Sequence, residues 1–534
     1  MSKAFLVCCA AMALSLGARA ATFDAKTFGA KADGKTLDRD AINKAIDAAA
    51  AAGGGTVYLP AGTYVTGSIR LRSNITLQLE HGTVIEASTD VTAYDAAEPN
   101  QWDKFQDSGH SHWHNSLIWG EDLENVSILG PGLIYGKGLS RGSSARTRAV
   151  PTNTPPTEAH ADGDNPVYPN PRDTLEAGIG NKSIALKNCH NVILRDLSIL
   201  HGGHFAILAT GVDNFTIDNL KIDTNRDGMD IDCCRNVRVS NCSVNSPWDD
   251  AICPKSCYAL GYPRPTENLT IVNCFVTGGY EEGTLLDGTC KRFTGTETNR
   301  IGHTGRIKCG TESNGGFKNI TIANCVFDYC GGLALESVDG AIMEDVTIDN
   351  IAMRDIVNSP IFIRLGNRAR GPNNPSVGVI RRVNISNIVC SNSNWRLGSV
   401  ISGIPGHPIE DLHISNVHFV YQGGGAKTNA TVDPPERERA YPEPSMFGTM
   451  PAYGFFIRHV KGLEMDHVDV SYVKDEMRPA IVLNDVAGAE FDHVKARRTP
   501  DVPFFVLHNV SDFALHNCPG LTDTNRATVE HETF

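Results

Sequence analysis

Short alternations of hydrophobic and polar residues run through most of the chain, and one pattern recurs. Each copy starts at Asn or Asp, continues with alternating hydrophobic residues, and reaches a second Asn or Asp before a small residue. Copies that begin at Asn191, Asn214 and Asn236 are 23 and 22 residues apart. A unit of this length holds two or three short strands and leaves no room for a helix. The repeat therefore predicts an all-β fold, a parallel β-helix whose coils stack strand on strand.

A β-propeller is the alternative fold for such a repeat. Its blades need about forty residues and four antiparallel strands each. Because most copies here are shorter, a single-stranded β-helix is favoured. In that fold the repeated Asn and Cys residues are expected to form ladders in the interior turns of the coils.

One helix is predicted near the start of the chain, over residues 38–52, and the glycines Gly53, Gly54 and Gly55 end it. Its apolar face consists of Ile42, Ala45, Ile46 and Ala49. A helix that leads into many strands can cover the open end of a β-helix, where unpaired backbone groups invite aggregation. We therefore expect residues 21–90 to form an N-terminal cap and the first coils.

The first twenty residues are typical of a secretory signal peptide. Lys3 precedes the apolar run AFLVCCAAMALSLG, and Ala18-Arg19-Ala20 forms a small-residue cleavage site. No later run reaches the ~18 uninterrupted apolar residues of a membrane span. The sequence thus predicts a signal peptide over residues 1–20, a β-helix domain over 21–534, and a secreted or periplasmic location.

Charge limits the partners that the protein can bind. The formal net charge is −13, from 48 Lys and Arg against 61 Asp and Glu. A net negative charge does not favour binding to nucleic acid or to an anionic membrane. An acidic substrate would have to be bound by local basic residues. Separately, the chain is expected to be a monomer.

Thirteen of the 15 cysteines follow the signal segment, and five of them come directly after Asn. These five are Cys189, Cys242, Cys274, Cys325 and Cys518. Cysteines that repeat in phase suggest small hydrophobic side chains stacked inside the coils. Metal binding is the alternative, but no paired C-x-x-C motifs are present.

Five irregular segments interrupt the repeat, at 99–115, 139–176, 258–267, 291–305 and 423–452. In a solenoid such insertions project from one corner and become the walls of a cleft. Their aromatic and histidine side chains either stack on sugars or pack their own loops. These residues are Trp102, His110, His112, Trp113, His114, Tyr441 and Phe447.

Carboxylates are concentrated in the segment 224–256. Asp227 and Asp249 are 22 residues apart, which equals one coil and places them on neighbouring coils. We expect their carboxyl groups to lie roughly 5–9 Å apart, a spacing that suits cleavage of a glycosidic bond. Asp250 adds a third carboxylate, and crowding should raise the pKa of at least one of the three. Asp230 and Asp232 are interpreted as solvated turn residues.

Two cations follow on a later coil. Arg306 and Lys308 alternate around Ile307, so both side chains point to one side of a strand. They either form an ion-pair ladder with the carboxylates or capture a carboxylate of the substrate.

These motifs resemble glycoside hydrolase family 28, the polygalacturonases and their relatives. The match lies in Asn225-x-Asp227-Gly228-x-Asp230, Asp249-Asp250 and Arg306-Ile307-Lys308, in the order and near the spacing of that family. The resemblance implies a right-handed, pectin-lyase-like β-helix and hydrolysis with inversion. It implies Asp249 as general acid, Asp227 and Asp250 as the groups that activate water, and Arg306 and Lys308 as uronate-binding residues.

The chain departs from the family at one coil. Where a Gly-His-Gly is usual, the sequence has Gly278-Gly279-Tyr280-Glu281, so Tyr280, Glu281 or His303 is expected to take that place. His204 and Trp248 are further candidate sugar contacts. The change makes a branched or terminal pectic linkage more plausible, and segment 440–456 could close one end of a groove and favour exo-action.

The primary hypothesis is therefore an exported hydrolase of α-galacturonosyl bonds in pectic oligo- or polysaccharide, without a metal or other cofactor. A β-helix lyase is one alternative, with Ca²⁺ held by Asp227, Asp249 and Asp250. A non-catalytic carbohydrate-binding solenoid is the other.

Overall fold

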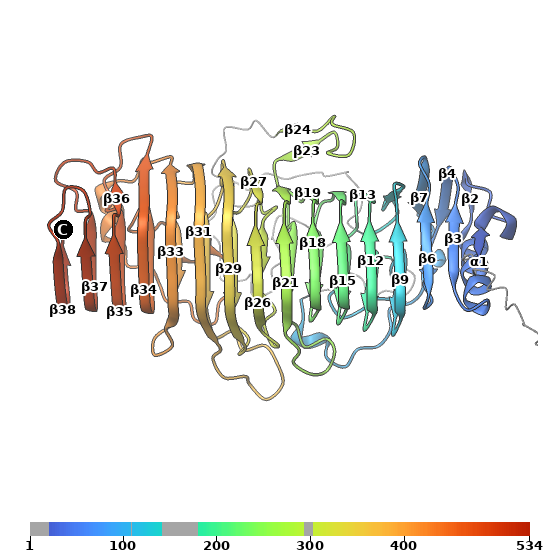
Figure 1. Cartoon of the computed structure of the whole chain (residues 1–534), viewed down its shortest axis with the longest axis horizontal. Helices are drawn as coiled ribbons and strands as arrows, with labels where there is room; N and C mark the ends of the chain where they lie inside the picture. The colour runs from blue at the N-terminus through green and yellow to red at the C-terminus, as the bar shows by residue number, and fades with distance from the viewer. Residues whose placement is uncertain (1–20, 108, 141–179, 293–302) are drawn as a thin grey trace, which may run out of the picture.

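A computed structural model describes residues 21–107, 109–140, 180–292 and 303–534. The predicted signal peptide and most of the predicted insertion at 139–176 lie outside these residues. The described strands form a long parallel β-helix, with α1 (Arg39–Ala51) at one end and β38 (Thr524–Thr533) at the other (Figure 1). The predicted parallel β-helix is confirmed.

Three parallel sheets run along the solenoid, and each coil contributes one strand to each sheet. Sheet 1 consists of β3 (Gly55–Leu59), β6 (Ile75–Leu79), β9 (Glu124–Leu129), β12 (His190–Arg195), β15 (Asp213–Asp218), β18 (Arg235–Ser240), β21 (Thr266–Val272) and β26 (Phe317–Ala323). Sheet 2 consists of β2 (Asp33–Leu37), β4 (Gly62–Thr66), β7 (Thr83–Ala87), β10 (Leu133–Tyr135), β13 (Ser198–Leu200), β16 (Lys221–Asp223), β19 (Ser243–Asn245), β22 (Phe275–Thr277) and β27 (Val326–Asp328). Sheet 3 consists of β5 (Ile69–Arg70), β8 (Ile118–Glu121), β11 (Lys182–Lys187), β14 (Phe205–Thr210), β17 (Asp227–Asp232), β20 (Ile252–Lys255), β25 (Ile307–Cys309), β28 (Leu333–Ser337), β30 (Ile361–Leu365) and β32 (Ser399–Ser402).

The C-terminal coils have longer strands that continue from one sheet into the next. These are β29 (Ile342–Arg354), β31 (Val379–Ser393), β33 (Ile409–Tyr421), β34 (Phe455–Tyr472), β35 (Ile481–Asp492) and β37 (Phe505–His516), with β36 (Lys495–Ala496) beside β34. At the N-terminal end β1 (Thr22–Asp24) pairs with β3, and β38 pairs antiparallel with β37 at the other end. A hairpin of β23 (Tyr280–Glu282) and β24 (Lys291–Arg292) projects from the solenoid (Figure 1).

The N-terminal helix has the predicted position and orientation. Helix α1 buries Ile42, Ala45, Ile46 and Ala49, the face that its periodicity predicts. It packs against β1 and β3, so the first coil is covered instead of ending in open strand edges.

The core is made by inward-facing side chains of all three sheets. Each of the five in-phase cysteines is free and buried, which confirms the predicted stacking. The predicted asparagine ladder also exists, because Asn214 Nδ2 donates to Asn191 Oδ1 at 3.0 Å and Asn236 Nδ2 donates to Asn214 Oδ1 at 3.2 Å. Its place was predicted wrongly: these asparagines are exposed and lie near the starts of β12, β15 and β18, at positions with positive φ, where a short polar side chain tolerates the left-handed backbone.

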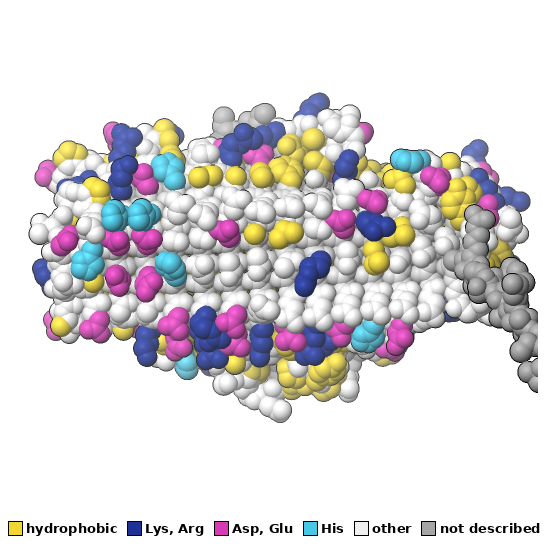
Figure 2. Space-filling model, viewed as in Figure 1, with side chains coloured by type: hydrophobic (Ala, Val, Ile, Leu, Met, Phe, Trp, Pro, Cys, Tyr) yellow, Lys and Arg dark blue, Asp and Glu magenta, His cyan; other side chains and the backbone are white. Residues whose placement is uncertain are grey.

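Most of the outer face of sheet 1 shows neither hydrophobic nor charged side chains (Figure 2). Acidic and histidine side chains gather on this face over the C-terminal coils. The carboxylates of segment 224–256 belong to sheet 3 and its turns, on another face of the solenoid.

Candidate active site

The outward face of sheet 3 carries a row of ionisable side chains. Because side chains alternate along a strand, Met229 and Ile231 of β17 enter the core and Asp230 and Asp232 point outward. The next strands repeat this arrangement, with Lys255 outward on β20, Lys308 on β25 and Glu336 on β28. The interpretation of Asp230 and Asp232 as solvated turn residues is therefore wrong, since both lie inside β17 and are fully buried.

Three aspartates meet where the chain enters sheet 3. Asp227 is the first residue of β17, and Asp249 and Asp250 form the turn before β20. The Gly228 N–H donates to the Asp250 carbonyl at 2.9 Å, which fixes the two coils in register. Each of the three offers a carboxylate oxygen within 4.8 Å of the others, so they lie closer than the lower limit predicted from one coil of rise.

Four cations surround the three aspartates. Arg226 Nη2 lies 3.0 Å from Asp249 Oδ2. Arg306 Nε donates to Asp250 Oδ1 at 2.8 Å, and Lys308 Nζ pairs with the other oxygen of Asp250. Lys255, outward on β20, is close enough to influence the charge of Asp227 and Asp249. The sequence reasoning did not select Arg226 or Lys255, although both are cations beside the selected aspartates.

The three carboxyl groups differ in their affinity for a proton. Burial and the neighbouring carboxylate of Asp230 raise the pKa of Asp227 well above its ordinary value. Burial also favours the neutral form of Asp249, but Arg226 and Lys308 outweigh it and lower the pKa of Asp249. In the same way Lys308 and Arg306 overcome burial and lower the pKa of Asp250. One of the three pKa values is therefore raised, that of Asp227, and burial contributes more to the rise than the crowding that was predicted.

A second charged cluster lies beside Asp227 on the same face. His110 Nε2 is 2.9 Å from Asp230 Oδ2, and Lys255 Nζ is 3.1 Å from Glu312 Oε2. Arg370 reaches the cluster from the segment 366–378, an insertion that the sequence reasoning missed. Because each charge here has a counter-ion, the cluster joins the outward faces of β17 and β20 to the insertion that carries Arg370.

The predicted sugar contacts lie around Asp249 with one exception. His204 Nε2 is 3.2 Å from Arg226 Nη2, and the ring of Trp248 lies 4.7 Å from the ring of His303. His303 Nδ1 is 2.7 Å from the Gly278 carbonyl, so this ring occupies the coil in which the family histidine was missing. His303 Nε2 lies 3.7 Å from Glu281 Oε1.

Tyr280 is the exception. It lies on the hairpin strand β23, and its backbone carbonyl accepts a hydrogen bond from Asn245 Nδ2 at 2.9 Å. The charges that act on its hydroxyl come from Asp328, Arg292 and Arg354, at the edge of sheet 2. The structure therefore does not bring the Tyr280 side chain to the three aspartates.

Two walls cover the outward face of sheet 3 on either side of the aspartates. On the N-terminal side, Trp113 from the 99–115 insertion is buried against Phe205 and Leu208. On the C-terminal side, Phe447 and Met450 from the 423–452 insertion are buried against sheet 3. Trp113 and Phe447 therefore pack their own walls and do not present open sugar-stacking surfaces. We refer to the part of sheet 3 between these two walls, which holds the aspartates, as the recess.

The C-terminal wall supplies groups that the sequence did not reveal. Glu443 pairs with the guanidinium of Arg306, and its Oε2 is 3.3 Å from Arg306 Nη1. Glu336 is fully buried, and neither of its carboxylate oxygens has a hydrogen-bond partner among the described residues. Burial raises the pKa of Glu336 to about 8, against the opposing charges of Lys308 and Arg306.

A calcium ion would meet unfavourable charges at the three aspartates. Their oxygens are close enough to share a cation. However, Asp250 already binds Arg306 and Lys308, and Asp249 binds Arg226. A divalent ion would have to displace or approach these cations, so the residues present fit an ion-paired site better than a calcium site.

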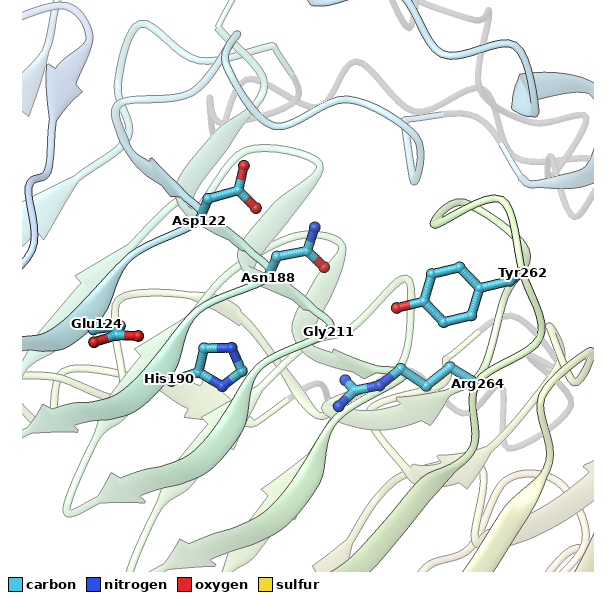
Figure 3. Close-up of a pocket in the computed structure, with 7 residues that line it drawn as sticks. All are labelled: Asp122, Glu124, Asn188, His190, Gly211, Tyr262 and Arg264. Carbon is cyan, nitrogen blue, oxygen red and sulfur yellow. The ribbon is translucent and has the colours of Figure 1, made fainter.

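A separate depression of about 400 Å³ lies on the turns between sheets 3 and 1 (Figure 3). Tyr262 and Arg264 point across it toward Asn188 and His190. At its floor the Gly211 N–H donates to the carbonyl of Asp232, at the end of β17 opposite Asp227. The depression is therefore distinct from the aspartate site.

Comparison with known proteins supports the family resemblance. A family model described as rhamnogalacturonase A/epimerase, pectate lyase-like, matches residues 22–249. A "Probable polygalacturonase" of Vitis vinifera is 23% identical over 466 residues, which cover 82% of each chain. An "Exo-poly-alpha-D-galacturonosidase" of Dickeya chrysanthemi is 29% identical over 292 residues, which cover 47% of this chain and 45% of that protein.

A solved structure shows the same fold. The family 28 exopolygalacturonase of Yersinia enterocolitica superposes with a TM-score of 0.58 at 20% identity, over 90% of this chain and 79% of that one. This likeness establishes the right-handed parallel β-helix. No helix in the described part of the chain is long and apolar enough to span a membrane.

Proposed function

We propose that this chain, which is a polygalacturonase-like protein of the glycoside hydrolase family 28 type, hydrolyses α-galacturonosyl linkages in pectic polysaccharide. One observation carries the proposal: Asp227, Asp249 and Asp250 offer oxygens within 4.8 Å of one another and are enclosed by cations. The names of the Vitis and Dickeya relatives support this substrate.

Asp249 is the proposed general acid. Its side chain is 22% exposed, whereas that of Asp250 is 1% exposed, so Asp249 is the better placed to reach a glycosidic oxygen. In the unliganded protein Arg226 keeps Asp249 ionised. A uronate that binds Arg226 would weaken this pair and raise the pKa of Asp249, which could then accept a proton from Asp227, the carboxyl group whose pKa is raised.

That proton transfer prepares both halves of the reaction. Asp249 becomes the acid that protonates the leaving oxygen, and Asp227 becomes a carboxylate beside Asp250. A water held by Asp227 and Asp250 attacks the anomeric carbon, the bond from that carbon to the leaving oxygen breaks, and the water proton passes to Asp227 or Asp250. The products are two shorter sugars with one new reducing end.

We propose inversion at the anomeric carbon, although the nearest oxygens are closer than the ~6.5–9.5 Å between carboxyl groups that is usual for inverting enzymes. The third carboxylate supports inversion, because Asp227 and Asp250 can hold water from one side while Asp249 protonates from another. The closed walls at both ends of the recess favour action at a chain end.

The test is hydrolysis of defined pectic oligosaccharides, with reducing ends and unsaturated products measured separately. Asp249→Asn should lower kcat by roughly 10²–10⁴-fold and keep the fold. Asp411→Asn, at an exposed position of β33 with positive φ where other coils carry Asn, is the matched control and should be fully active. NMR of fresh product should show the inverted anomer.

Normal activity of Asp249→Asn would contradict its role, and a retained anomer would contradict activation of water by Asp227 and Asp250. Ultraviolet-absorbing unsaturated products would instead favour the lyase. Binding without any product would favour a carbohydrate-binding solenoid. We also propose export by the N-terminal hydrophobic segment, to be tested by N-terminal sequencing of protein recovered from the periplasm and the medium.

A further inference from the structure

The guanidinium of Arg306 is bound on both sides. Its Nε donates to Asp250 Oδ1 at 2.8 Å, and its Nη1 and Nη2 face the carboxylate of Glu443. Arg306 is 1% exposed, so little of it is open to solvent. A carboxylate of the substrate could reach the fork of this arginine only by displacing Glu443, since a planar guanidinium binds one carboxylate in the bidentate manner at a given edge.

Glu443 is held in this place by the wall that carries it. Asn358 Nδ2 is 3.5 Å from its Oε2, and Phe447, four residues later, is buried against sheet 3. On the other side Tyr441 lies with its ring 6.0 Å from Lys308 Nζ, and its hydroxyl accepts a hydrogen bond from Thr311 at 3.4 Å. The wall is therefore attached to the solenoid on both sides of Glu443.

Glu336 adds a second carboxyl group to the same end of the recess. It follows Leu335, which pairs with Cys309 in the register of β25 and β28, and so lies beside Gly310. A Cβ at Gly310 would lie 2.8 Å from the Glu336 Cβ and 3.4 Å from Glu336 Oε2, so only glycine leaves room for this side chain. The charges of Lys308, Arg306 and Glu443 all act on Glu336, which places it beside them. Both of its oxygens lack a hydrogen-bond partner among the described residues.

Charge therefore differs between the two ends of the recess. On the Arg226 side, Arg226 and His204 lie beside Asp249. On the Arg306 side, the carboxylates of Asp250 and Glu443 match the charges of Arg306 and Lys308. Burial raises the pKa of Glu336 to about 8, so this group adds no negative charge at neutral pH. A further carboxylate would meet only cations that are already paired there, whereas hydroxyl or ester groups need no cation.

We propose that Glu443 selects an uncharged sugar unit at the Arg306 side of the recess. This inference rests on the proposed function. The scissile bond then joins a galacturonosyl unit on the Arg226 side to a neutral sugar or a methyl-esterified uronate on the Arg306 side. Arg306 holds Asp250 in place.

The test compares three oligosaccharides that share a non-reducing galacturonosyl unit and differ in the next sugar. That sugar is a free galacturonate, its methyl ester or a neutral sugar, so the ester and neutral arms separate the two sources of an uncharged unit. The wild-type protein should have a kcat/KM at least about 10-fold higher for one of the uncharged arms than for free galacturonate.

Glu443→Gln should raise kcat/KM on the free galacturonate and reduce the preference for the uncharged sugar by about 10-fold. Glu438→Gln, in the same wall, should leave the preference unchanged. A wild-type preference for free galacturonate would overturn the inference, because it would mean that Glu443 yields its place to the substrate. An equal loss of kcat/KM on all three substrates in Glu443→Gln would also overturn the inference, but it would leave the proposed hydrolase intact. Absence of hydrolysis in every arm would overturn the hydrolase itself.

Discussion

Replacement of Glu336 by Gln should change how the stability of the protein depends on pH. Glu336 lies on β28 and is fully buried, and burial raises its pKa to about 8 although Lys308 and Arg306 oppose the rise. In an unfolded chain the same group titrates near 4.5. A Gln amide has nearly the same shape as the carboxyl group and does not titrate. The variant therefore removes one proton-binding site and little volume.

The direction in which the free energy of unfolding changes with pH follows from which state, folded or unfolded, binds the Glu336 proton more tightly. Between pH 4.5 and about 8 the folded state keeps the Glu336 proton while the unfolded state has lost it. The contribution of this group is fully present below pH 4.5, and the free energy of unfolding falls as pH rises to about 8. The slope is at most about 1.4 kcal/mol per pH unit, which amounts to roughly 4 kcal/mol across three units.

Thermal unfolding of the wild-type protein and Glu336→Gln at several values between pH 5 and pH 8 measures this effect. The informative quantity is the difference in Tm between the two proteins, because every other titrating group is common to both. We expect the difference to grow in favour of Glu336→Gln as pH rises. Glu490→Gln, at an exposed position of β35, should give a difference that does not change with pH.

A Tm difference for Glu336→Gln that stays constant from pH 5 to pH 8 would refute the reasoning. It would mean that Glu336 is ionised in the folded protein at the lowest of these values, with Lys308 or Arg306 as its counter-ion. Destabilisation by the same amount at each pH would lead to the same conclusion.

Two further predictions concern the aspartates. Arg226→Gln should raise the pKa of Asp249, because Arg226 is the strongest of the cations that lower it. The alkaline limb of the kcat/KM profile should then move to higher pH, and a limb that does not move would exclude Asp249 as the general acid. Treatment with a chelator should leave the activity unchanged, because Arg306 and Lys308 already neutralise Asp250. A loss of activity that Ca²⁺ restores would favour the lyase.

Most of the fold could be predicted because its signals are local. The repeat length defines a coil, and the alternation within each copy decides which side chains face the core. Helix α1 follows the same rule with a period of 3.6 residues, and its four buried residues are the predicted ones. The in-phase cysteines were identified as core residues for the same reason. The asparagine ladder was placed on the wrong side, because alternation does not show how a left-handed turn directs its side chain.

The candidate site could be predicted only in part. The proximity of Asp227 to Asp249 and Asp250 follows from the length of one coil, and that of Lys308 and Arg306 follows from their place on the same sheet. Asp230 was misassigned because a short polar-apolar alternation resembles a turn when its strand is unknown. The bulky walls were expected from their aromatic content, but their packing against sheet 3 was not.

The sequence by itself determined that the chain is a β-helix and that three aspartates and two cations share one region, because a repeat converts spacing along the chain into position in space. Only the tertiary structure decided which charges meet. Glu443 reaches Arg306 across 137 residues of sequence, and His110 reaches Asp230 from a loop that belongs to no repeat. Such contacts depend on how insertions fold over the solenoid, and insertions have no period. The chemistry of the recess is therefore set by the coils, and the charge of its two ends by the walls.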